Sequence, residues 1–162
     1  MTDWSRYQSL PGVLLGFHGT QKLVVDEVIN QRYKHLTPST KAYDWLGNGV
    51  YFWENDPQRA QEWAEEKKLP NPSVVGCVMD LGLCLDLTTR MGCDEVTAAY
   101  RSFEQNMQKL KRGIPINDKG ADKLRRVLDC QVIMYLHQLR QESKLSAYDS
   151  VRAAFPESDE LY

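Results

Sequence analysis

The apolar residues of this chain form two kinds of segment, and the order of these segments is the strongest constraint on the fold. Runs too short for helices of their own lie at 13–17, 50–53, 73–80 and 83–87. Longer segments, at 94–111 and 124–139, repeat apolar residues at helical spacing. Because the short and long segments do not alternate regularly, the sequence predicts an α+β fold with mixed strands.

Two of the short runs are followed by signals for the start of a helix. Thr20 follows the first run and is predicted to cap a helix over 21–31. Asp56 follows the second run, and Pro57 at the first helical position predicts a helix that ends near Lys68. The sequence therefore predicts two junctions at which a strand leads into a helix.

Length and charge favour one domain without a general affinity for nucleic acid. A chain of 162 residues fits a single domain over 1–162, and a formal net charge of −2 provides no global basic field. The N-terminus lacks a secretory signal, and no apolar run approaches the roughly 18 residues of a membrane span. We expect a cytoplasmic protein with no membrane partner.

The cysteines give little indication of a metal site or a disulfide. The four cysteines form no C-x-x-C pair, and three of them lie in or beside apolar runs. We interpret them as reduced packing residues, against the alternatives of zinc or a disulfide, and predict no metal.

The first segment that carries chemistry is His18-Gly19-Thr20. A histidine at the open end of a buried strand is expected to point its imidazole into a cleft. Gly19 leaves its own N–H and C=O accessible to a planar ligand. The alternative, a histidine that only bonds nearby backbone, stays open.

The second such segment is 45–54, in which two glycines precede an aromatic strand. Alternation along this strand predicts Tyr51 and Trp53 on one face and Phe52 on the other. One aromatic face could stack on a planar cationic ring such as nicotinamide. Core packing is the alternative, and we favour it for Trp53. Because the glycines precede a strand, neither the P-loop nor the Rossmann fingerprint applies.

Together these segments resemble a known family. Residues 17–20 (Phe-His-Gly-Thr), followed about thirty residues later by 49–52 (Gly-Val-Tyr-Phe), resemble the His and Tyr motifs of diphtheria-toxin-like and poly(ADP-ribose) polymerase-like ADP-ribosyltransferases. The longer stretch 43–54, with Arg59-Ala60 and Trp63-Ala64, resembles a bacterial, poorly characterised branch of that superfamily. The resemblance covers most of residues 12–157 and is strongest over 16–64. It implies a split mixed β-sheet core with flanking helices.

The resemblance also implies an activity, namely transfer of ADP-ribose from NAD to an unidentified acceptor with release of nicotinamide. His18 would bond a ribose hydroxyl, the Gly19 backbone would hold the carboxamide, and Tyr51 would stack on the nicotinamide. Thr20, Ser39 and Gly49 complete the expected NAD-binding set. NAD would be a substrate, and no metal is implied. Toxin-like or defence proteins occur in such a branch, so an antitoxin is among the expected partners.

The third polar residue of the family's site is the point at which the sequence departs from the pattern. Related domains continue past the segment 155–158 into a further strand, so one or more C-terminal strands are expected to be missing. Glu157 and Glu54 are the candidates for the third position. Their alternatives are a solvated terminal carboxylate for Glu157 and a helix-end or salt-bridge role for Glu54. We expect weak NAD binding, slow turnover and self-association through an exposed sheet edge.

Three rival functions stay open. They are a catalytically degenerate NAD-binding or nucleotide-binding module, a tRNA 2′-phosphotransferase-like enzyme and a purely structural interaction domain. The phosphotransferase would require an arginine-rich set that the sequence does not show. Release of nicotinamide separates the transferase from the degenerate module.

Overall fold

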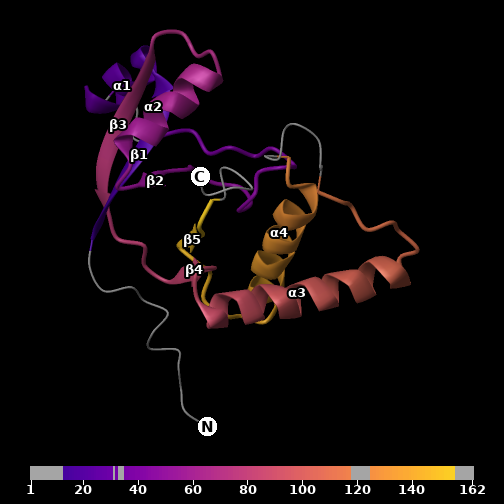
Figure 1. Ribbon diagram of the computed structural model, residues 1–162. Helices are drawn as coiled ribbons and strands as arrows, with labels where there is room; N and C mark the ends of the chain where they lie inside the picture. Colours follow the sequence, from indigo (N-terminus) through magenta and orange to yellow (C-terminus); the bar gives the residue numbers. More distant parts are fainter. Residues whose placement is uncertain (1–12, 31, 33–34, 118–124, 156–162) are drawn as a thin grey trace, which may run out of the picture. The chain divides into compact units, whose positions relative to one another are not determined.

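The computed structural model describes residues 13–30, 32, 35–117 and 125–155, and these residues form a mixed α+β structure (Figure 1). The α+β class expected from the sequence is confirmed. The chain divides into two compact units. Residues within 11–39 and 49–80 form one, here called the strand-rich unit. Residues within 40–48 and 81–162 belong to the other, here called the helical unit. The expectation of a single domain stays a prediction.

The strand-rich unit contains a three-stranded antiparallel sheet in the order β2-β1-β3. The central strand β1 (Leu14–Gln21) pairs along its whole length with β3 (Pro72–Met79). On its other side β1 pairs with β2 (Trp53–Glu54) only at Gly16 and Phe17. Figure 1 shows β1 and β3 running side by side, with the two helices of this unit next to them.

Helix α2 (Pro57–Glu66) packs against β1 and β3. Its start is as predicted, because the Asp56 side chain accepts a hydrogen bond from the Arg59 N–H at 2.8 Å and Pro57 occupies the first turn. Ala60 and Ala64 are completely buried, so small side chains allow the helix to approach the sheet closely.

Three predicted boundaries in this unit are wrong. The first strand does not deliver His18 at its end, because pairing with β3 extends β1 through Gln21. Helix α1 (Lys22–Ile29) therefore has Gln21 as its N-cap, without a side-chain cap bond, and Thr20 lies within the strand opposite Ser73. The predicted strand 50–53 overlaps β2 only at Trp53, because pairing with β1 is limited to Trp53 and Glu54.

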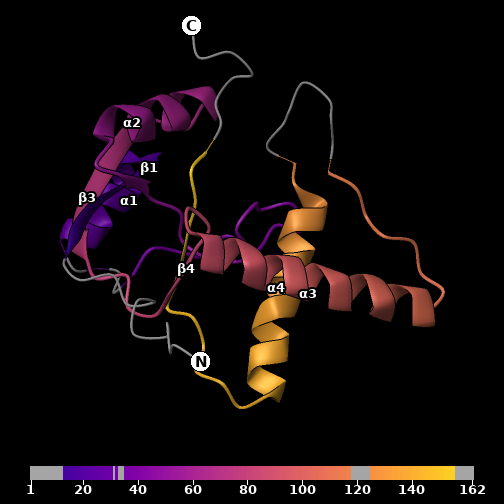
Figure 2. The same ribbon diagram turned by 60° about the horizontal axis from the view of Figure 1, so that its bottom comes forward.

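The helical unit contains a two-stranded parallel sheet and two helices. Strand β4 (Cys84–Asp86) pairs with β5 (Ser150–Arg152), and helix α3 (Arg90–Lys109) crosses α4 (Val127–Glu142), as Figure 2 shows. The core of this unit consists of seven buried residues from β4, α3, α4 and the segment before β5: Leu85, Ala99, Phe103, Val132, Ile133, Leu136 and Tyr148. Both predicted helical stripes are confirmed as helices.

The start of each helix in this unit depends on a side chain outside the apolar stripe. Thr89 accepts a hydrogen bond from the Gly92 N–H at 3.2 Å, so α3 begins four residues earlier than predicted. Asn117 caps α4 from ten residues upstream, since its side-chain oxygen accepts from the Leu128 N–H at 3.0 Å. The same Asn117 amide donates to Asp129 at 2.8 Å. Periodicity alone could not locate either cap.

All four cysteines lie in the part of the chain that the structure describes, and there they are free thiols. Cys84 and Cys130 are buried, and burial raises the pKa of both thiols. A raised pKa leaves little thiolate at neutral pH, which agrees with a packing role for these two. Cys93 is exposed in the first turns of α3, so it is not a core residue.

Candidate functional site

The two motifs singled out in the sequence meet in the strand-rich unit. The Nδ1 atom of His18 lies 2.7 Å from the main-chain carbonyl oxygen of Tyr51. A carbonyl can only accept a hydrogen bond, so Nδ1 carries the proton in this arrangement. In the neutral ring Nε2 is then a hydrogen-bond acceptor. The backbone-bonding role that the sequence left open for His18 is therefore present, and it uses only one of the two ring nitrogens.

Phe52 is the aromatic side chain that contacts His18, and sequence reasoning assigned it no role. The two ring centroids are 5.7 Å apart and the planes are tilted by 56°. Trp53 instead lies near Trp63 of α2, with centroids 6.4 Å apart, and the Arg59 guanidinium lies 4.9 Å from the Trp53 ring centre. The predicted opposite orientation of Phe52 and Trp53 is thus observed. The period-2 pattern of the sequence already indicated that Phe52 and Trp53 lie on opposite faces. It did not indicate which of the two faces carries His18.

Gly19 is buried, and a close packing contact limits what can stand at this position. A Cβ atom at this position would lie 2.0 Å from the Ala60 carbonyl oxygen, so only glycine fits beneath α2. The Leu15 carbonyl accepts from the Asn55 N–H, and main-chain groups alternate sides along a strand. The N–H and C=O of Gly19 therefore point to the same side as Leu15, where pairing with β2 has already ended at Phe17.

Ser39 and Gly49 also come together. They form an isolated antiparallel bridge, with N–H to C=O distances of 2.8 and 3.0 Å in the two directions. Ser39 is half-buried, and the bridge places it at the start of the segment that carries Tyr51. Thr20 is 9 % exposed and lies on β1 two residues beyond His18, so it shares the face of His18.

The structure describes only one of the two candidates for the third polar position. Glu54 is exposed and pairs with Gly16, and alternation puts it on the face of the sheet that carries His18 and Phe52. Glu157 lies outside the described residues. Tyr51 is half-buried, and its carbonyl, not its ring, makes the described contact with His18.

A groove of about 980 Å³ lies elsewhere, in the helical unit. Its lining includes Gln131, Met134, Gln138 and Tyr148 along α4 and the segment that follows it. Burial, together with the charge of Arg140, lowers the pKa of His137 in this lining. None of the predicted site residues lies there.

Among the described residues, no cluster of His, Cys, Asp or Glu has the composition of a metal site.

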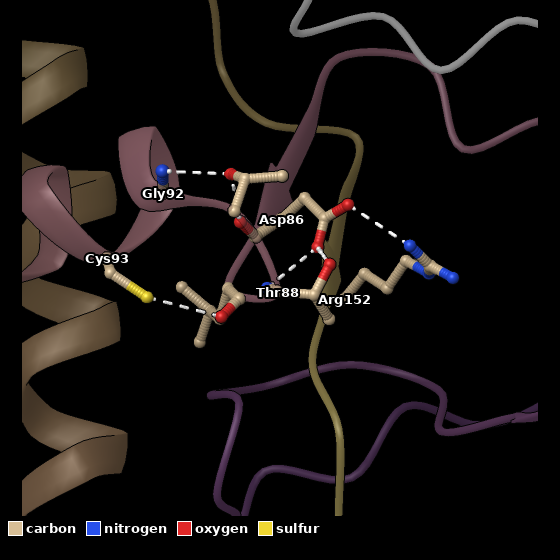
Figure 3. Close-up of polar contacts among 7 residues, drawn as sticks. Asp86, Thr88, Gly92, Cys93 and Arg152 are labelled. Carbon is tan, nitrogen blue, oxygen red and sulfur yellow. Dashed lines mark hydrogen bonds and ion pairs between the residues drawn. The ribbon is translucent and has the colours of Figure 1, made fainter.

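A second polar cluster joins β4 to β5 in the helical unit (Figure 3). Asp86 is 8 % exposed, and one of its oxygens accepts from the Thr88 hydroxyl at 2.6 Å and the Thr88 N–H at 2.9 Å. The other oxygen pairs with Arg152 at 3.1 Å. Burial by itself would raise the pKa of this carboxyl, but the Thr88 hydrogen bonds and the Arg152 charge outweigh it and lower the pKa. This cluster holds the strand pair together.

We expect Asp86→Asn to destabilise the helical unit by about 1.5–3 kcal/mol at pH 7, because hydrogen bonds to a charged group are lost. A lowered folded-state pKa means that the contribution of Asp86 is complete above the ordinary carboxyl pKa of about 3.9 and is lost as the pH falls below it. Urea unfolding between pH 3 and pH 7 should therefore converge for the variant and the parent at low pH. Asp94→Asn is the matched control, since its pair with Arg90 is exposed. Equal pH dependence in the two variants would contradict the assignment.

No protein-family model, curated protein or solved structure matches this chain. None of the helices in the described part of the chain has the length and apolar character needed to span a bilayer.

Proposed function

We propose that the strand-rich unit binds the nicotinamide-ribose half of NAD and that the protein transfers ADP-ribose to an acceptor, releasing nicotinamide. The observation that carries this proposal is the 2.7 Å contact between His18 Nδ1 and the Tyr51 carbonyl. It joins the two motifs whose order and residues resemble those of ADP-ribosyltransferases.

The donors and acceptors around His18 fit the chemistry of this half of NAD. In the neutral ring with its proton on Nδ1, Nε2 of His18 is an acceptor, which suits a ribose hydroxyl. The Gly19 N–H and C=O offer one donor and one acceptor, which suits a carboxamide, a group with one C=O and one NH₂. Gly19 itself is buried, and pairing of β1 with β2 ends at Phe17, so β2 does not bond the main-chain groups of Gly19. Tyr51, in the adjoining segment, is the ring proposed to stack on nicotinamide.

The reaction needs little from these residues beyond orientation. The bond between ribose C1′ and the nicotinamide nitrogen breaks, the electron pair stays on that nitrogen, and nicotinamide leaves as a neutral molecule. Positive charge develops on the ribose, and an acceptor nucleophile then bonds to C1′ and loses its proton. A fixed carboxylate near the ribose would stabilise that charge. Glu54 is the described candidate, since alternation gives it the face of His18.

The test is release of labelled nicotinamide from NAD by the 162-residue chain, with NAD binding followed in parallel by calorimetry. We expect slow release and measurable binding. Tyr51→Ala should weaken binding by about twofold to tenfold through lost stacking, whereas Tyr51→Phe, which keeps the ring, should not. The melting temperature of Tyr51→Ala without NAD should stay close to that of the parent. Binding without release would make this a degenerate NAD-binding module, and no binding would reject both readings.

A further inference from the structure

We infer that Phe52 is the positioning residue for His18, acting together with the Tyr51 carbonyl to hold the imidazole as a hydrogen-bond acceptor at Nε2. This inference rests on the proposed function only for its effect on NAD. The geometry concerns residues of one unit and can be tested without any ligand.

The first step is the orientation of the imidazole. A ring attached to a strand can rotate about its side-chain bonds and can exchange its proton between the two nitrogens. The Tyr51 carbonyl at 2.7 Å removes both freedoms, because it accepts only from Nδ1–H. The contacts that hold this carbonyl in place therefore determine which nitrogen of His18 carries no proton.

The second step concerns what holds the Tyr51 carbonyl. Tyr51 lies two residues before the start of β2 at Trp53, and Phe52 is the residue between them. Phe52 is anchored, because its Cβ atom packs over Gly16 of β1 and its ring lies 5.7 Å from the His18 ring. Aromatic pairs at such distances are favourable beyond the area they bury. Phe52 thus contacts the ring of His18 directly and is joined through one peptide unit to the carbonyl that accepts from it.

The third step is the room that Gly16 provides. A Cβ at Gly16 would lie 3.2 Å from the Phe52 Cβ and 2.0 Å from the terminal methyl group of Met79. The Met79 side chain can move aside, but Phe52 would have to shift by a few tenths of an ångström. Gly16→Ala therefore displaces Phe52 without altering either His18 or Tyr51.

The experiment uses the full chain with ¹⁵N-labelled histidine and reads the tautomer of each imidazole from its long-range ¹⁵N–¹H correlations. His18→Gln assigns the His18 signals. We expect a single Nδ1–H tautomer for His18 in the parent and a mixture in Phe52→Leu and Gly16→Ala. Phe52→Tyr, which keeps a ring, should restore the single tautomer. Trp53→Leu is the matched control, because the Trp53 ring contacts α2 and not His18.

A single unchanged tautomer in Phe52→Leu and Gly16→Ala would overturn the inference, and Gly16→Ala decides alone if Phe52→Leu fails to fold. In the NAD assay, Phe52→Leu should raise KM by about fivefold with little change in kcat, as expected for one weakened hydrogen bond. Failure of the proposed function is distinguishable. A tautomer that depends on Phe52 in a protein without NAD binding would leave the positioning role intact and reject only the ligand.

Discussion

Gly19→Ala should lower the free energy of unfolding by about 3 kcal/mol, the upper end of the usual cost of overpacking. The new Cβ would lie 2.0 Å from the Ala60 carbonyl oxygen. That atom belongs to the backbone of α2 at a completely buried position, so it cannot rotate away as a flexible side chain would. The helix must move from the sheet or the strand must bend.

Urea unfolding followed by tryptophan fluorescence measures this effect, since Trp53 and Trp63 both lie in the strand-rich unit. Gly49→Ala is the matched control, because a Cβ there would meet nothing within 4 Å. Its free energy of unfolding should stay within about 0.5 kcal/mol of the parent. A Gly19→Ala protein as stable as the Gly49→Ala protein would mean that α2 does not approach β1 as closely as described.

His18→Ala should lower kcat/KM for nicotinamide release by about tenfold, chiefly through a higher KM for NAD. The reason is that His18 is proposed to accept a hydrogen bond from a ribose hydroxyl that exists before and during the reaction. Such an interaction stabilises bound NAD and the transition state similarly, so its loss affects binding more than the chemical step.

Initial rates over a series of NAD concentrations separate the two constants for His18→Ala. His35→Ala is the control, since His35 is exposed in the same unit and its Nδ1 also faces a carbonyl oxygen, that of Leu36 at 3.1 Å. The His35 variant should match the parent in both constants. A His18→Ala protein whose kcat falls while its KM is unchanged would assign His18 to the chemical step instead.

These two predictions separate two properties that meet in adjacent residues of β1. The side-chain position of Gly19 faces α2, whereas His18 faces Phe52 on the opposite side of the sheet. Stability and the proposed recognition of NAD are therefore expected to change one at a time, in variants of Gly19 or of His18. A residue with a side chain would meet α2 at position 19, so packing requires glycine there. This reason is separate from the binding role that the sequence predicted for Gly19.

Local sequence patterns determined the elements of the structure. Helical spacing predicted α3 and α4, the Asp56-Pro57 pair located the start of α2, and the apolar runs located β3 and β4. Period-2 alternation placed Phe52 and Trp53 on opposite faces. These features depend on residues within one turn or one strand of each other, so the information is contained in neighbouring residues.

Only the tertiary structure decided the features that depend on a distant partner. Pairing with β3 carried β1 past His18 to Gln21, and so removed Thr20 from the predicted capping position. Asn117 reached α4 from upstream to cap it, and the Tyr51 carbonyl selected the tautomer of His18. In each case one hydrogen-bonding group is satisfied by a residue remote in sequence. Local propensity carries no information about such a partner, because it exists only when the chain has folded.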